Sequence, residues 1–134
     1  MRRGNLFSLF VLTVLLSLVV VTPARAGVPE DLTAFKTAAN ELKACMVSIT
    51  NEATAKSQLS TLDTAITKYN NASTALDTSL GALDRAVEAN ARLYQSAQTE
   101  KQTAADTLTA DQVRMLAAPP IAAVVAPKLS TIRQ

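Results

Sequence analysis

The chain has 134 residues, of which 49% are hydrophobic and only 4% aromatic, and it carries a formal net charge of +2 with no histidine. The missing histidine excludes Ser-His-Asp and Cys-His nucleophiles and removes the commonest ligand of zinc, copper and haem. The single cysteine excludes an intramolecular disulfide.

The first 26 residues have the pattern of a secretory signal peptide. Arg2 and Arg3 precede an almost wholly apolar run from 6 to 21, and Ala24-Arg25-Ala26 ends in the small-x-small pattern that signal peptidase cuts. We expect cleavage after Ala26 and an exported, periplasmic or extracellular protein. The alternative is an uncut segment that holds the chain in a membrane.

Cleavage would remove three of the 13 basic residues and no acidic residue, leaving ten against 11 and a net charge of −1. The remaining lysines and arginines are scattered singly among acids, whereas nucleic-acid-binding proteins carry a basic face. We therefore expect no nucleic-acid partner.

A first helix is predicted from residue 28, because Pro29 suits the first helical turn and Glu30 and Asp31 complement the positive end of the helix dipole. Apolar residues then recur at alternating steps of three and four. They are Leu32, Phe35, Ala39, Leu42, Met46, Ile49 and Ala53.

A second and longer stripe of the same period runs from Leu59 to Leu108. The average step of 3.5 residues keeps one side of a helix facing a partner helix. The two stripes are out of phase, because Leu59 follows Ala53 by six residues instead of seven, so the chain either turns back or changes its winding between 53 and 59. The strongest positions of the second stripe are Leu59, Leu62, Ile66, Leu76, Leu80, Leu83 and Val87.

We favour a helix that continues through 53–59, with the turn at 69–73, where Asn70 and Asn71 tolerate left-handed backbone and cap helices. The two arms would then form an antiparallel helical hairpin domain over residues 27–118. The second stripe passes Ser73 without losing phase, as an unbroken helix would also do.

Near the end, Thr109 is predicted to cap a short helix that Pro119 and Pro120 stop, which leaves residues 119–134 as an irregular, flexible, Pro-containing tail. The pentapeptide from Leu108 to Gln112 resembles the LTxxQ pattern of the Spy-like periplasmic chaperones. That family carries the motif as a pair, whereas this chain has one copy, so no functional residue is carried over. The resemblance implies a small helical protein that binds unfolded clients.

Cys45 lies at the edge of the first stripe, where the sequence favours a buried structural thiol. The alternative is an intermolecular disulfide across a symmetric dimer, which requires Cys45 to face its copy.

The sequence thus predicts an all-α protein, a long helical hairpin or coiled-coil-like bundle, with no enzymatic activity, cofactor, metal or small-molecule substrate. We expect a structural or protein-interaction module of the cell envelope, with a protein partner or self-association and with membrane contact only through an uncleaved signal. The alternatives are a chaperone-like binder of unfolded clients and an amphipathic protein on a membrane surface. The residues expected to form the helix contacts are Leu42, Met46, Ile49, Leu59, Leu62, Ile66, Leu76, Leu80, Leu83 and Val87.

Overall fold

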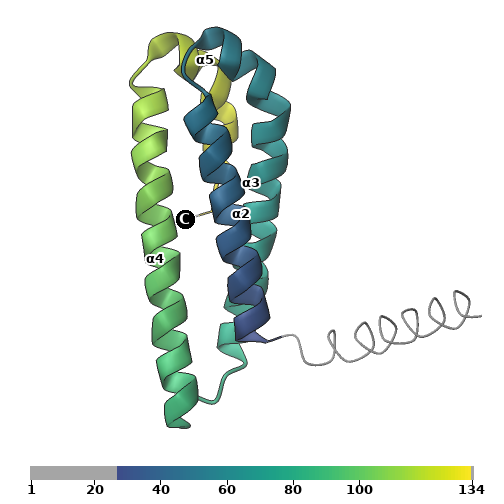
Figure 1. The fold of residues 1–134 in the computed structure, drawn as a ribbon, viewed down its shortest axis with the longest axis vertical. Helices are drawn as coiled ribbons and strands as arrows, with labels where there is room; N and C mark the ends of the chain where they lie inside the picture. Colours follow the sequence, from purple (N-terminus) through teal and green to yellow (C-terminus); the bar gives the residue numbers. More distant parts are fainter. Residues whose placement is uncertain (1–26, 134) are drawn as a thin grey trace, which may run out of the picture.

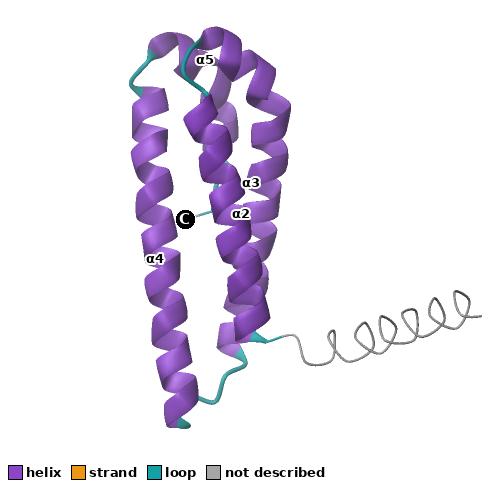
Figure 2. Cartoon of the chain, in the orientation of Figure 1, coloured by secondary structure: helices purple, strands orange, loops and turns teal. Residues whose placement is uncertain are grey.

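The computed structural model describes residues 27–133, which fold into four helices with no strand among them. The all-α prediction is confirmed for these residues, while the predicted signal peptide lies outside them (Figure 2). The helices are α2 (Val28–Ser48), α3 (Glu52–Gly81), α4 (Glu88–Leu116) and α5 (Pro119–Leu129).

The helices run alternately up and down and form a bundle (Figure 1). α2 packs against both α3 and α4, and α5 packs against the same two helices from the other side. The chain therefore crosses the bundle where it passes from α3 to α4. Because α5 is much shorter than its neighbours, it covers only the end of the bundle where α2 stops and α3 begins.

The first reversal of the chain occurs at residues 49–51. Asn51 caps α3: its side chain accepts a hydrogen bond from the Thr54 backbone N–H at 2.8 Å, and Thr54 Oγ1 accepts one from the Asn51 N–H at 3.0 Å. Residues 53–59 are helical, as predicted, but they belong to a helix that begins at Glu52. The two stripes are out of phase because a turn at residues 49–51 separates two helices, and not because one helix changes its winding.

The predicted turn at 69–73 is wrong, because α3 runs through it without interruption. Asn70 caps no helix. Its side chain bonds instead to the backbone of Thr131 and Arg133, beyond α5. Ser73 is buried, at the stripe position that the unbroken phase had indicated. The local preference for a turn is outweighed here by the tertiary hydrogen bonds of Asn70 and by the burial of Ser73.

The second reversal lies at residues 82–87, inside the predicted second stripe. Asp84 Oδ1 accepts a hydrogen bond from the Ala86 N–H at 3.0 Å, and the Asn90 amide donates to the Asp84 carbonyl at 3.0 Å. These local bonds organise the loop as Asp and Asn commonly do in turns. The stripe keeps its spacing across this loop without being one helix.

Two predictions for the carboxyl-terminal part are also corrected. Thr109 caps no new helix, because α4 continues through it to Leu116. Residues 119–129 are not an irregular tail but the helix α5, in which Pro119 and Pro120 occupy the first turn. Proline is favoured there because the first N–H groups of a helix have no intrahelical acceptor. Packing of Ile121, Val125 and Leu129 against the bundle supplies the stabilisation that a short Pro-containing helix needs.

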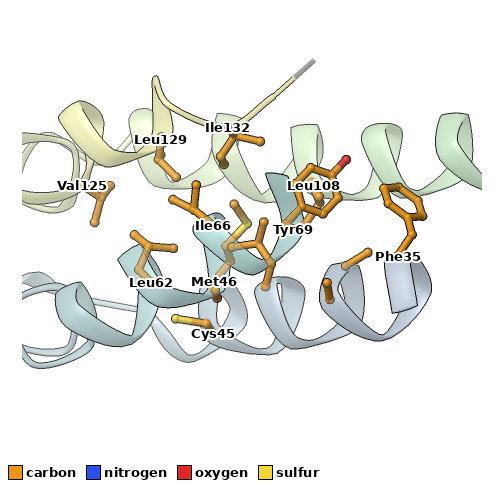
Figure 3. Close-up of a cluster of buried hydrophobic side chains, with 14 of the residues drawn as sticks. Phe35, Cys45, Met46, Leu62, Ile66, Tyr69, Leu108, Val125, Leu129 and Ile132 are labelled. Carbon is orange, nitrogen blue, oxygen red and sulfur yellow. The ribbon is translucent and has the colours of Figure 1, made fainter. Parts of the chain in front are cut away.

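One hydrophobic core joins all four helices (Figure 3). The Phe35 ring from α2 and the Tyr69 ring from α3 meet with their centroids 5.3 Å apart. Most of the remaining core consists of aliphatic side chains and alanines. The largest fully buried side chains are Phe35, Leu42, Met46, Ile49, Leu62, Leu76, Leu108, Met115, Val28 and Val125.

Candidate functional site

The predicted helix-contact residues mostly face the inside of the bundle. Leu83 packs against the core from the 82–87 loop, and Leu59 is half-buried. Val87 departs from the stripe: it precedes α4 and is 48% exposed. The side chains that are buried within the single chain are Leu42, Met46, Ile49, Leu62, Ile66, Leu76 and Leu80. They are engaged by the chain's own helices, so a partner surface has to be sought elsewhere.

Cys45 lies on the side of α2 that faces α3, and only 7% of it is exposed. Burial raises the pKa of its thiol above the ordinary value, because the interior disfavours the thiolate. This location fits a structural thiol. Cys45 also lines the surface depression between α2 and α3, so a disulfide between two copies would require this depression to face its copy.

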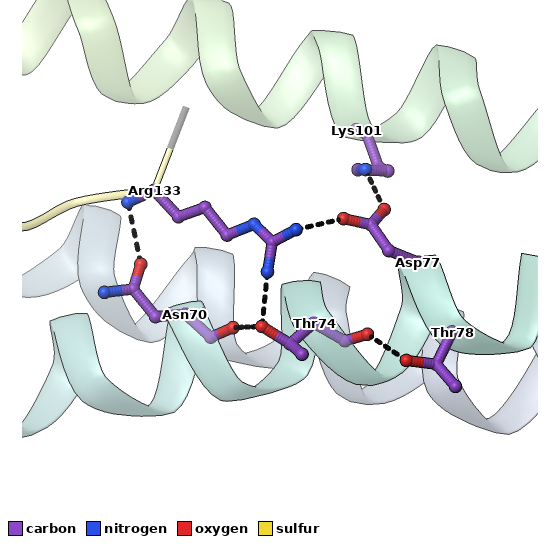
Figure 4. Close-up of polar contacts among 6 residues, drawn as sticks. All are labelled: Asn70, Thr74, Asp77, Thr78, Lys101 and Arg133. Atoms are coloured by element: carbon purple, nitrogen blue, oxygen red, sulfur yellow. Dashed lines mark hydrogen bonds and ion pairs between the residues drawn. The ribbon is translucent and has the colours of Figure 1, made fainter.

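A polar network joins α3, α4 and the segment after α5 (Figure 4). The Asp77 carboxylate accepts a hydrogen bond from Lys101 of α4 and another from Arg133 Nη2, the latter at 2.8 Å. Arg133 also bonds to the Thr74 hydroxyl. The carboxylate thus links two cations that are distant in the sequence, one on α4 and one after α5. Its single negative charge is already paired with two cations, so its chemistry is that of a structural contact.

Arg114 forms a second structural contact at the opposite face of α4. Its guanidinium donates to the carbonyls of Met46 and Ile49 at 2.7 and 2.8 Å. These carbonyls belong to the end of α2, where helix C=O groups lack intrahelical donors. Arg114 therefore holds the end of α4 against the end of α2.

The exposed large apolar side chains include Val113 and Leu116, at 62% and 47% exposure, in the last turn of α4. The chain continues from there without a single polar side chain between Arg114 and Lys128. Pro119, Pro120, Ala123 and Pro127 are exposed on α5. We call Val113 together with residues 115–127 the apolar segment. Isolated exposed apolar residues are ordinary, whereas a segment of this composition on a surface is typical of interaction sites.

This surface was not predicted, because the prolines at 119, 120 and 127 indicated an irregular tail over residues 119–134. The signal was present in the uncharged run itself, which is helical in composition apart from its prolines. The spacing of apolar residues alone did not indicate which side of this run packs against the bundle. The structure buries Ile121, Val125 and Leu129 and leaves the opposite side of α5 exposed.

The surface is hollowed on both sides of α2. The cleft between α2 and α4 has a volume of about 150 Å³ and is lined by Lys36, Lys43 and Glu100 among small and aliphatic residues. Lys36 and Glu100 form an ion pair at 3.8 Å, and both are largely solvated. The hollow between α2 and α3 is a wide surface depression lined mainly by Ser, Thr, Ala and Lys. Each of these two hollows is lined by one carboxylate, Glu100 in the first and Glu41 in the second, and Cys45 also lines the second.

Residues 27–133 contain no group of three or more Cys, Asp or Glu side chains placed to hold a metal ion. None of the helices within the same range combines the length and the apolar character needed to cross a membrane. Comparisons of the chain with models of known protein families, with curated proteins and with solved structures found no match.

Proposed function

We propose that the protein is an exported, non-catalytic helical module that acts in the cell envelope through protein contacts. The observation that carries the proposal is the apolar segment, Val113 with residues 115–127, at one end of a bundle whose predicted contact residues mostly pack inside the chain's own core. Such a surface is more apolar than a free helix end needs to be, because exposed helix faces are normally charged or polar.

The composition of the surface also supports a protein partner over a lipid one. Membrane-surface helices combine Lys or Arg on one face with Trp, Phe or Leu on the other. The exposed side of α5 carries alanine and proline, which offer little area for burial among acyl chains.

Export and contact are tested together by placing a photo-crosslinking residue at Leu116 in the full chain and expressing it in a bacterium with a periplasm. A matched control carries the same residue at Thr99, which is exposed on the polar face of α4. We expect a cleaved protein outside the cytoplasm that forms discrete adducts from position 116 and none from position 99. A cytoplasmic protein would contradict the export half of the proposal, and equal adducts from both positions would contradict the contact half.

A chaperone-like role is the second candidate, and the same exposed side chains favour it, because binding of unfolded clients requires exposed apolar surface. A chaperone would bind many unrelated unfolded proteins, whereas the first proposal expects specific partners. The purified mature chain would suppress aggregation of several unrelated unfolded proteins at stoichiometric ratios, and Val113→Ser with Leu116→Ser would abolish this. Suppression that survives the double substitution would place the client surface elsewhere, and lack of suppression would exclude the role.

A further inference from the structure

α5 is joined to the rest of the bundle by a very short connection. Only Ala117 and Ala118 separate the last residue of α4 from the first residue of α5. Ala118 is extended, with φ −102° and ψ 102°, the conformation that a residue before proline prefers. The helical path therefore ends at Leu116 and starts again at Pro119. A change of backbone angles at the two alanines between them would redirect α5 without unwinding either helix.

The buried side of α5 resembles a bound amphipathic helix. Ile121, Val125, Leu129 and Ile132 recur at steps of four, four and three, and each is at most 6% exposed. Helices bound in apolar grooves of other proteins present their anchors at the same spacing. Figure 3 shows Val125 and Leu129 next to side chains of α3, including Leu62 and Ile66. We call the surface of α3 and α4 under α5 the α5 seat.

The far end of α5 is fastened by polar contacts near the surface. The Asn70 amide donates to the Thr131 carbonyl at 2.9 Å, and its oxygen accepts from the Arg133 N–H at 2.8 Å. Lys128 pairs with Asp63 at 3.0 Å, with both side chains substantially exposed. Arg133 adds its bonds to Asp77 and Thr74. Each partly exposed contact of this kind contributes a modest free energy, and detachment of α5 requires all of them to open together.

From these contacts we propose that α5 leaves its own seat and docks in the seat of a second copy, so that two chains exchange α5 reciprocally. The exchanged pair keeps the contacts that α5 makes with its seat in the single chain, because the seat is identical in both copies, and only the bonds at the connection change. Its population is then set by concentration and by the short connection, since short connections favour exchange of a terminal element.

Exchange also accounts for the side chains that remain exposed beside the connection. Val113 and Leu116 directly precede Ala117, and they are 62% and 47% exposed in the single chain. In a reciprocal pair the two connections lie near the two-fold axis, where the last turns of the two α4 helices come together. Burial of these four side chains is a gain that the single chain lacks. The exchange does not depend on export or on another partner.

The seat is tested with a fluorescent synthetic peptide of residues 117–133 and the full mature chain. In Val125→Asp the chain's own α5 is charged at a fully buried position, so its seat should be vacant. We expect this variant to bind the peptide at least about tenfold more tightly than wild type does, because a competing segment reduces apparent affinity by the fraction of free seats. A peptide that itself carries Val125→Asp is the control and should not bind.

Equal binding of the peptide by both chains, or binding by neither, would overturn the proposal. If Val125→Asp loses its helical circular dichroism, Val125→Ala takes its place. This variant removes two methyl groups without adding a charge, and it should raise peptide affinity by a smaller factor. An unchanged affinity in a folded Val125→Ala chain would likewise overturn the proposal.

The reciprocal pair is measured by light scattering of the reduced, full mature chain after incubation at protein concentrations up to about 1 mM, a range that detects even weak association. We expect a dimer with unchanged helicity, whose fraction falls at least about tenfold in Val113→Ser with Leu116→Ser. Val87→Ser is the matched control, because Val87 is 48% exposed and precedes α4 at the opposite end of the bundle from the connection (Figure 1). A wild-type chain that stays monomeric throughout, or an equal loss in Val87→Ser, would contradict the exchange.

Discussion

The α2–α3 pair and α4 are held in the bundle by different means. α2 has seven buried residues among 21 and α3 has eight among 30, whereas α4 has only three among 29. α4 is fastened instead by directional polar contacts, namely Arg114 to the end of α2 and Lys101 to Asp77. The comparison teaches that the pair is stabilised mainly by apolar burial, and that α4 depends more on contacts that salt and substitution weaken.

The largest effect is expected when a charge enters the buried side of the pair. Leu76 is fully buried on α3, so Leu76→Asp places an unpaired carboxylate in the core and should cost more than about 4 kcal/mol, enough to abolish the folded state at 25 °C. Leu83→Asp is the matched control and should cost less, because Leu83 is only half-buried in the loop that follows α3. Urea titration followed by circular dichroism measures both. Equal losses in the two variants would refute the burial ranking.

The polar fastening of α4 is tested at Arg114. Arg114→Ala removes two charge-assisted hydrogen bonds from the end of α2, and we expect a loss of about 1–2 kcal/mol in the free energy of unfolding after allowance for partial exposure. Arg114→Lys keeps the charge but lacks the planar fork that reaches two carbonyls, so it should recover less than half of the loss. Complete recovery by lysine would show that charge alone holds α4.

The stability of the α2–α3 pair is also expected to fall at alkaline pH. Burial raises the pKa of Tyr69 above its ordinary value of 10.0, and the nearby negative charge of Asp77 raises it further. The raised pKa means that the stabilising effect of the neutral phenol is complete below pH 10 and is lost as pH rises through the folded-state pKa. Tyr69→Phe should therefore lose less stability than wild type between pH 9 and 11 in chemical denaturation. Parallel losses would remove tyrosine ionisation as the cause.

The smallest expected effect is a gain at the end of α3. Gly81 is the last residue of this helix, its φ is not positive, and an added Cβ would meet no atom within 4 Å. Gly81→Ala should stabilise the chain by up to about 0.5 kcal/mol, because glycine loses more conformational freedom on folding than alanine does. Ser79→Ala, which removes the hydroxyl bonded to Asp31, should move the thermal midpoint in the opposite direction. A loss of stability in Gly81→Ala would show that the loop after α3 requires glycine.

Much of the core was predictable because burial in a helical bundle follows the spacing of apolar residues. Leu42, Met46, Leu62, Ile66, Leu76 and Leu80 were identified by spacing alone, and each is buried. The turns were less predictable, since Asn70 and Asn71 have the composition of a turn and nevertheless lie in the middle of α3. Local propensity differs between helix and turn by only tenths of a kcal/mol per residue, so packing decides such positions.

The apolar segment was the least predictable part of the candidate site. Its prolines indicate a helix stop when they are considered with the preceding residues and a helix start when they are considered with the following ones. The deciding contacts are those of Ile121, Val125 and Leu129 with helices that are distant in the sequence. No local pattern contains that information.

The sequence by itself determined the helical class and most of the buried side chains, because a period near 3.5 residues places apolar groups on one side of a helix wherever that helix goes. Only the tertiary structure decided where the chain reverses, that the last residues form a fourth helix, and which of its sides stays exposed. The physical reason is that these features depend on free energies gained between distant residues, above all the burial of Ile121, Val125 and Leu129 against α3 and α4, which exceed the small local preferences of the backbone.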